Sequence, residues 1–128
     1  MTFFRRRNKF KAVRTGGMAS KLEYAVFCIL KFREKSGEIK DIKSQVPVLL
    51  QSGDKLTRIS WKCDFGFIDV KSGATVFAEA KGLEDQNFKL KLRLYRKVRT
   101  EKLEIWRGSY TKPFLSEVIN GEKSEKSK

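Results

Sequence analysis

Histidine is absent from this chain of 128 residues. Its absence excludes serine and cysteine nucleophiles activated by histidine, zinc sites with histidine ligands, and nucleases that use a histidine base. Cysteine is scarce, and the separation of Cys28 and Cys63 fits no metal site. We expect both to be buried free thiols in a reducing cytoplasm. An enzyme of this composition would depend on carboxylates, lysines and a hard metal ion.

Long apolar runs are also missing, because no stretch approaches 20 apolar residues and no signal-peptide pattern is present. We therefore expect no membrane association and a cytoplasmic location, in a bacterium or a phage-infected cell. Acidic residues are few, 15 against 29 Lys and Arg, which gives a formal net charge of +14. Such an excess favours a polyanionic partner, and nucleic acid is a better candidate than an anionic membrane.

The length suits one domain with its own apolar core. Residues 1–19 predict a basic flexible arm, residues 20–110 a folded domain, and residues 111–128 a C-terminal extension that is disordered from residue 121. Apolar spacing predicts helices over 20–35 and 85–99, and strands over 42–51, 58–70, 75–81 and 103–106. We expect an α/β fold of order αβββαβ, with helices flanking a small mixed sheet.

The segment FAEAKG, residues 77–82, places two charged side chains in an apolar strand. Glu79 and Lys81 are two residues apart, so they point to the same face of that strand. On the preceding strand, large side chains alternate with Asp64 and turn it to the opposite face; they are Ile59, Trp61, Cys63, Phe65 and Phe67. A hairpin about residues 71–73 would bring Asp64 and Glu79 together on one face.

Two adjacent carboxylates repel each other unless a cation lies between them. Mg²⁺ binds through one or two carboxylates, water and phosphate oxygens. We predict that Asp64 and Glu79 bind Mg²⁺, for which Mn²⁺ can substitute, with the carbonyl of Ala80 as a further ligand. Lys81 would orient or help deprotonate a metal-bound water, or offset charge on the phosphate. The alternative is a surface ion pair of Glu79 and Lys81, worth under about 1 kcal/mol.

Two further polar residues have open interpretations. Glu23 could contact the metal or its water, or it could bond back to the Ser20 amide in a capping box, and the residues alone favour neither. Gln45 could reach the site from the first predicted strand, or it could be an ordinary strand residue.

Basic residues in three places are predicted to contact DNA phosphates. They lie in the N-terminal arm, beside Asp64, and between the apolar residues of the second predicted helix. The set is Arg5, Arg6, Arg7, Lys9, Lys11, Arg14, Lys62, Lys89, Lys91, Arg93, Arg96 and Lys97.

The order of elements and the spacing of the acids resemble the PD-(D/E)xK nuclease superfamily. Its signature is a helix Glu, then an Asp, then Glu-x-Lys on adjacent strands, and Glu23, Asp64 and residues 79–81 match it. The resemblance covers roughly residues 20–106. The segments SKLEYAV and EAKGLEDQNFKLKLRL are most similar to small phage proteins, including the endonuclease I type of Holliday junction resolvase. Cys63 replaces the proline that the family's pattern has before the Asp.

The resemblance implies a Mg²⁺-dependent endonuclease that hydrolyses DNA phosphodiester bonds. It implies that Glu23 contacts the metal or its water, that Asp64 and Glu79 bind the metal, and that Lys81 is the catalytic lysine. It also implies branched DNA as substrate, which a homodimer with two sites would suit. The alternatives are a basic nucleic-acid-binding protein without catalysis, or a flap, recombination or transposon-end nuclease of the same fold.

Overall fold

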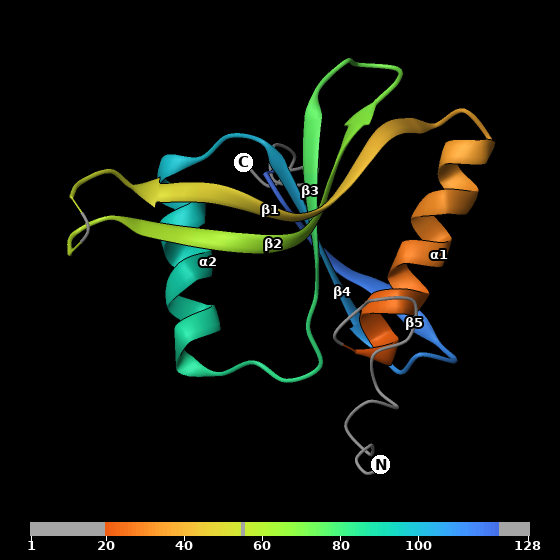
Figure 1. Cartoon of the computed structure of the whole chain (residues 1–128). Helices are drawn as coiled ribbons and strands as arrows, with labels where there is room; N and C mark the ends of the chain where they lie inside the picture. Colours follow the sequence, from red (N-terminus) through yellow and green to blue (C-terminus); the bar gives the residue numbers. More distant parts are fainter. Residues whose placement is uncertain (1–19, 55, 121–128) are drawn as a thin grey trace, which may run out of the picture.

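The computed structural model describes residues 20–54 and 56–120 (Figure 1). The predicted basic arm, with six residues predicted to contact DNA, and the tail from residue 121 lie outside these residues. Within the described ranges the elements are α1 (Lys21–Lys35), β1 (Ile39–Gln51), β2 (Ile59–Asp69), β3 (Thr75–Ala80), α2 (Gln86–Val98), β4 (Lys102–Gly108) and β5 (Pro113–Ile119). The α/β class and the predicted order αβββαβ are confirmed, and β5 follows as an additional strand.

The described strands form one mixed sheet in the order β1-β2-β3-β4-β5. β3 and β4 run parallel because α2 crosses over between them, and the other neighbours are antiparallel. Asp69 accepts hydrogen bonds from the Ser72 amide and hydroxyl in the turn between β2 and β3, where Gly73 has a φ of 76°. The predicted hairpin therefore forms at the expected place.

β5 was not predicted, because the predicted domain ended at residue 110. It pairs with β4 from Leu103↔Ile119 to Gly108↔Pro113, and Ile119 is only 3% exposed. The folded unit therefore extends through residue 119, and part of the predicted extension is a strand. The side chains of Phe114 and Leu115 are both exposed, so the alternation that marks a half-buried strand is missing.

Side-chain caps fix the start of each helix. The hydroxyl of Ser20 accepts a hydrogen bond from the Glu23 amide at 3.1 Å, and the carboxylate of Asp85 accepts one from the Phe88 amide at 2.9 Å. These bonds satisfy backbone donors that have no partner within the helix. α1 ends before Gly37, whose φ of 87° cannot continue a helix.

The sheet has an apolar core on each face. Beneath α2, the Trp61 ring meets Phe88 and Tyr95 edge to face, with centroid distances of 5.7 and 6.2 Å. Beneath α1, Phe27 stacks on Phe65 at 5.9 Å. Both tryptophans are buried, Trp61 beneath α2 and Trp106 beneath α1.

β2 contributes to both cores because it bends between them. Trp61 and Phe65 lie four residues apart, so simple alternation would put them in one core. β2 instead follows β1 across α2 and then turns beside β3 toward α1 (Figure 1). Asp41 and Gln45 of β1 have left-handed backbones, with φ of 55° and 54°, and the register shifts between Lys40 and Lys43. These irregularities accommodate the bend opposite Asp64.

The two cysteines lie in different surroundings. Cys63 is fully buried beneath α2, as predicted, whereas Cys28 is exposed and its predicted burial is wrong. Val26 and Leu30 turn the apolar side of α1 toward the sheet and leave Cys28 on the outer side. Neither described helix is long and apolar enough to cross a membrane.

Candidate active site

Strands β2 and β3 separate where the two predicted metal ligands lie. Their ladder ends at the pair Phe65↔Ala78. Beyond it, the Asp64 amide donates to Oε1 of Glu79 at 3.1 Å, and the Ala80 amide donates to Oδ2 of Asp64 at 2.9 Å. Each carboxylate thus accepts from the backbone of the opposite strand, in place of a bond between the two backbones. Asp64 and Glu79 are brought together at this fork.

Both carboxylates of the fork are held away from water. Glu79 is 9% exposed and Asp64 is half-buried. Burial, followed by the nearby charge of Asp64, raises the pKa of Glu79 to about 8. Burial also raises the pKa of Asp64. The charge of Lys81 offsets part of both rises. A proton or a cation would therefore stabilise this pair.

Glu23 and Gln45 lie on the α1 side of the fork. Glu23 is 4% exposed, and its Oε2 accepts a hydrogen bond from Nε2 of Gln45 at 3.2 Å. Glu23 is also among the charges that raise the pKa of Glu79, after burial and Asp64, so it lies near that carboxyl. The Ser20 half of the predicted capping box is present, and the Glu23 carboxylate is bound by Gln45.

Gln45 reaches Glu23 from a strained backbone. It lies opposite Asp64, between the pairs Ser44↔Phe65 and Val46↔Cys63. Its φ of 54° is rare for a residue with a Cβ and costs about 1 to 2 kcal/mol. Packing does not explain this conformation, because the Gln45 side chain is exposed, and the residue is not a glycine. Such strain persists where neighbouring contacts enforce it, often at functional sites.

Lys81 lies between the end of β3 and the first turn of α2. Its amide donates to the Trp106 carbonyl at 2.9 Å, and its ammonium nitrogen is 5.5 Å from the centroid of the Phe88 ring. Among the described residues, Lys81 and Glu79 form no ion pair. The alternative of a surface ion pair is therefore wrong, and it also fails because Glu79 is buried.

Arg107 is a neighbour of the site that the sequence did not indicate. Its guanidinium donates to the Lys81 carbonyl at 3.4 Å, pairs with Glu84, and lies 5.8 Å from the Phe88 centroid. It follows Trp106, which pairs with Ala80 in the parallel ladder. Knowledge of that register would have placed Arg107 beside Lys81.

The described basic residues that were predicted to contact DNA lie on α2 and β2. Four of the α2 residues are exposed, Lys91 is half-buried, and Arg96 is paired with Glu117 at 2.8 Å. Lys62 is exposed on β2, two residues before Asp64. The buried stripe of α2 faces the sheet, so its basic side faces solvent.

The fork offers oxygen donors that suit a hard cation. Within the described part of the chain, no donor reaches the second oxygen of Asp64 or Glu79. Two carboxylates with water and phosphate oxygens are sufficient for Mg²⁺. No group of three acidic or cysteine side chains able to hold an ion forms among residues 20–54 and 56–120. The roles of Glu23, as a contact of the metal or of its water, and of the Ala80 carbonyl stay predictions.

The comparisons with known proteins give no relative: no family model, no curated protein and no solved structure matches the chain. The function is therefore inferred from the site and its surroundings.

Proposed function

We propose that the protein is a metal-dependent nuclease that hydrolyses DNA phosphodiester bonds at the fork of β2 and β3. The observation that carries this proposal is a pair of hydrogen bonds across the fork, from the Asp64 amide to Glu79 and from the Ala80 amide to Asp64, which holds a buried and a half-buried carboxylate side by side. Buried acids with raised pKa values destabilise a fold, and they are concentrated at functional sites. The resemblance to the PD-(D/E)xK superfamily supports the same activity.

In this proposal, each residue around the fork has a separate role in hydrolysis. Mg²⁺, when bound, supplies a Lewis acid for the phosphate and a water of lowered pKa. Asp64 and Glu79 each offer it one oxygen, while their other oxygen fixes them to the opposite strand. Glu23, held by Gln45, accepts a hydrogen bond from the attacking water. Lys81 places a positive charge beside the phosphate, and Arg107 holds the backbone of Lys81.

Contacts with the DNA backbone come from the basic side of α2 and from Lys62. Lys and Arg on a solvent-facing surface neutralise phosphates without reading the bases. The hairpin of β1 and β2, which carries Lys62, extends across α2 (Figure 1). Selection by DNA shape, with branched DNA as substrate and a homodimer that presents two sites, is the finer form of the proposal.

A cleavage assay with Mg²⁺ or Mn²⁺ tests the proposal. The substrates are a four-way junction, a flap, a linear duplex and a single strand. The variants are Glu79→Gln and Asp64→Asn, and Glu104→Gln is the matched control. Glu104 is also a buried carboxylate, 8% exposed, but its partners are Arg33 and Trp106, away from the fork.

Cleavage by the wild type and by Glu104→Gln, lost with chelator and in both fork variants, is the expected result. Binding of DNA survives in the fork variants, and thermal melts of all variants show that each is folded. Tight binding to all four substrates without cutting under either metal would instead identify a nucleic-acid-binding protein without catalysis.

A further inference from the structure

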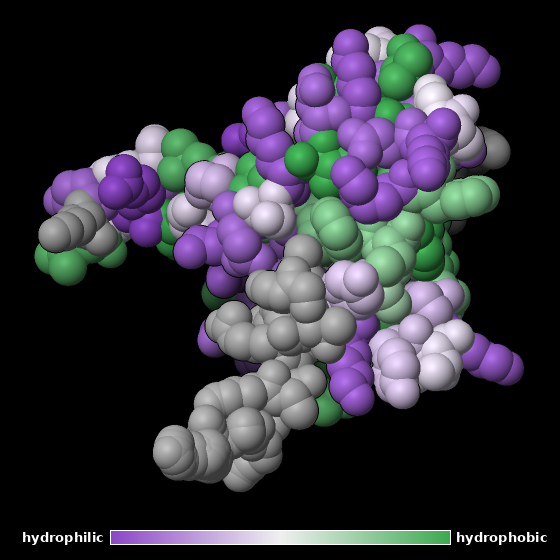
Figure 2. All heavy atoms as spheres, turned by 45° about the vertical axis from the view of Figure 1, so that its right-hand side comes forward, coloured by the Kyte–Doolittle hydropathy of each residue, from purple (hydrophilic) through white to green (hydrophobic). Residues whose placement is uncertain are grey.

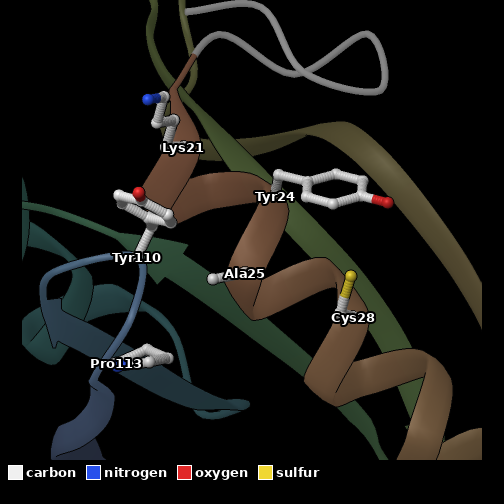
Figure 3. Close-up of a pocket in the computed structure, with 6 residues that line it drawn as sticks. All are labelled: Lys21, Tyr24, Ala25, Cys28, Tyr110 and Pro113. Atoms are coloured by element: carbon white, nitrogen blue, oxygen red, sulfur yellow. The ribbon is translucent and has the colours of Figure 1, made fainter.

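A groove on the outer side of α1 combines apolar surface with a cationic rim. Its volume is about 460 Å³, and it is lined by Lys21, Tyr24, Ala25, Cys28, Tyr110 and Pro113. Figure 3 shows Tyr110 and Pro113 along one side, Tyr24 and Cys28 along the other, and Ala25 between them. None of the six lining residues is acidic. Ala25 forms the floor of the groove, and its small side chain leaves the space between the two sides open.

A second hollow continues the groove toward the end of α1. It has a volume of about 520 Å³, shares Cys28 with the first, and is lined further by Lys31, Phe32, Glu34 and Lys35. The 15 residues of α1 span about 22 Å, which is the length of about three to four extended nucleotides. On the face turned forward in Figure 2, apolar surface lies between hydrophilic side chains.

The groove and the second hollow together form a continuous surface along α1, called the track below. Aromatic rings and ammonium groups occur together along this track. Phe32 is 72% exposed and Tyr110 is 54% exposed, so both rings present a face to solvent. The ammonium of Lys21 lies 4.9 Å from the centroid of the Tyr110 ring. Lys31 is paired with Glu34 at 2.9 Å, and Lys35 lines the far hollow. The track therefore carries three ammonium groups against one carboxylate.

We propose that this track binds an unpaired, single-stranded segment of nucleic acid. Bases stack on Tyr110 and Phe32, and the phosphates between them lie against Lys21 and Lys35. Every base has a flat π-face, so such stacking tolerates any sequence, while the lysines follow the backbone. A second copy of this chain fits the track less well, because it would bring another net charge of +14 against the same lysines.

The track adjoins the proposed catalytic fork across α1. Lys21 and Tyr24 line the groove, while Glu23, in the same turn of the helix, is buried and accepts from Gln45. A strand in the groove therefore lies across α1 from Glu23, about one helix diameter, roughly 10 Å, away. This inference rests on the proposed nucleic-acid substrate but not on catalysis. It names the preferred substrate as DNA with unpaired nucleotides beside the scissile phosphate.

Cys28 provides a direct probe of the track, because it is exposed and lines both hollows, whereas Cys63 is fully buried. The rate of Cys28 alkylation by a maleimide is measured on the full chain in Glu79→Gln, with chelator present. The measurement is repeated with a short oligothymidine and with a blunt duplex of equal phosphate concentration. Cys28→Ser shows which part of the signal belongs to Cys28.

We expect saturating oligothymidine to slow the alkylation of Cys28 by about tenfold or more, and the duplex to slow it much less. Two variants test the track itself. Ala25→Leu fills the floor, and Phe32→Ala removes a stacking surface. Each should weaken the binding of oligothymidine by about fivefold to a hundredfold without weakening duplex binding. Phe114→Ala, which removes an exposed ring of β5, is the matched control and should change neither.

Equal protection by duplex and single strand, or unchanged binding in Ala25→Leu and Phe32→Ala, would overturn the inference. Protection that grows with protein concentration in the absence of nucleic acid would overturn it too, because a second copy would then cover the track. These results are separate from the fate of the nuclease, since the footprint uses a fork variant without metal. Loss of cleavage activity in every assay leaves the footprint interpretable, and a failed footprint leaves the cleavage assay interpretable.

Discussion

The amide nitrogen of Gln45 donates to the carboxylate of Glu23 across 3.2 Å, from a residue whose φ is 54°. The contact links the bend of β1 to the first turn of α1, and the charge of Glu23 is near enough to Glu79 to contribute to the raised pKa of that carboxyl. A strained residue that holds an acid beside a pair of carboxylates is expected to position that acid.

Two substitutions of Gln45 distinguish the backbone strain of this residue from its role in positioning the Glu23 carboxylate. Both Gln45→Ala and Gln45→Gly lose the hydrogen bond to Glu23, but only glycine adopts a positive φ without strain. We expect Gln45→Gly to be more stable than Gln45→Ala by about 1 kcal/mol, and both to cut more slowly than the wild type. Urea unfolding and single-turnover cleavage measure the two effects. Equal stability of the variants would show that the strain is not retained in solution.

The raised pKa of Glu79 makes stability depend on pH. Its pKa is about 8 in the fold and has an ordinary value of 4.5, so the folded state binds the proton more tightly. This contribution to stability is fully present below about pH 4.5 and is lost as the pH rises through about 8. Glu79→Gln should therefore exceed the wild type in stability at about pH 9, by on the order of 5 kcal/mol, with little difference near pH 5. Thermal melts in chelator across this range measure the difference, and parallel curves would contradict it.

Metal binding should compete with that proton. Because Mg²⁺ binds the ionised carboxylate, its affinity should rise between about pH 6 and pH 8 and then level off. The increase in melting temperature that Mg²⁺ causes should follow the same profile in the wild type. It should be absent from Glu79→Gln and Asp64→Asn, and retained in Glu104→Gln. A metal-induced increase that persists in both fork variants would place the metal elsewhere.

The basic side of α2 should determine the salt dependence of DNA binding. Arg93 and Lys97 are exposed and have no ion pair among the described residues, whereas Arg96 is held by Glu117. Arg93→Ala and Lys97→Ala should each reduce the slope of log K against log salt by about 1. Arg96→Ala should reduce it less. Fluorescence anisotropy over a salt series measures the slopes, and three equal slopes would refute the distinction.

β5 should be required for folding although much of it is exposed. A chain that ends at residue 112 loses Ile119 from the core beneath α2 and uncovers β4. We expect it to be destabilised by several kcal/mol and to lack cooperative unfolding, since both pairing and burial are removed. Ending the chain at residue 120 is the control. A cooperative melt of the shorter chain would restore the domain boundary at residue 110.

The sequence was informative where a local pattern has one structural solution. Alternation and turn residues located β2 and β3, so the hairpin and the meeting of Asp64 with Glu79 could be predicted. A Ser or Asp before an apolar helical stripe located the helix starts. The sequence left open whether Gln45 reaches the site, and its hydrogen bond to Glu23 was not predicted.

Other features depend on contacts that no local pattern contains. Neighbouring apolar side chains of β5 are both exposed, so the sequence of this strand does not alternate between apolar and polar residues, and its pairing with β4 could not be predicted. The bend of β2 depends on a left-handed Gln45, and glutamine gives no warning of that conformation. Cys28 was misplaced because its neighbours on α1 are apolar. Arg107 could be placed beside Lys81 only with the β3–β4 register.

Because β2 bends, the two carboxylates of the fork belong to strands that are supported by different parts of the fold. Asp64 belongs to a strand whose first half rests on α2, whereas Glu79 belongs to β3, between the two cores. Beyond the pair Phe65↔Ala78, two hydrogen bonds from backbone amides to the carboxylates connect β2 and β3. Tilting the hairpin of β1 and β2 changes the separation of the two carboxylates. In the nuclease that we propose, DNA that presses on this hairpin would alter the spacing of Asp64 and Glu79, and we expect the rate of hydrolysis to depend on the curvature of the DNA.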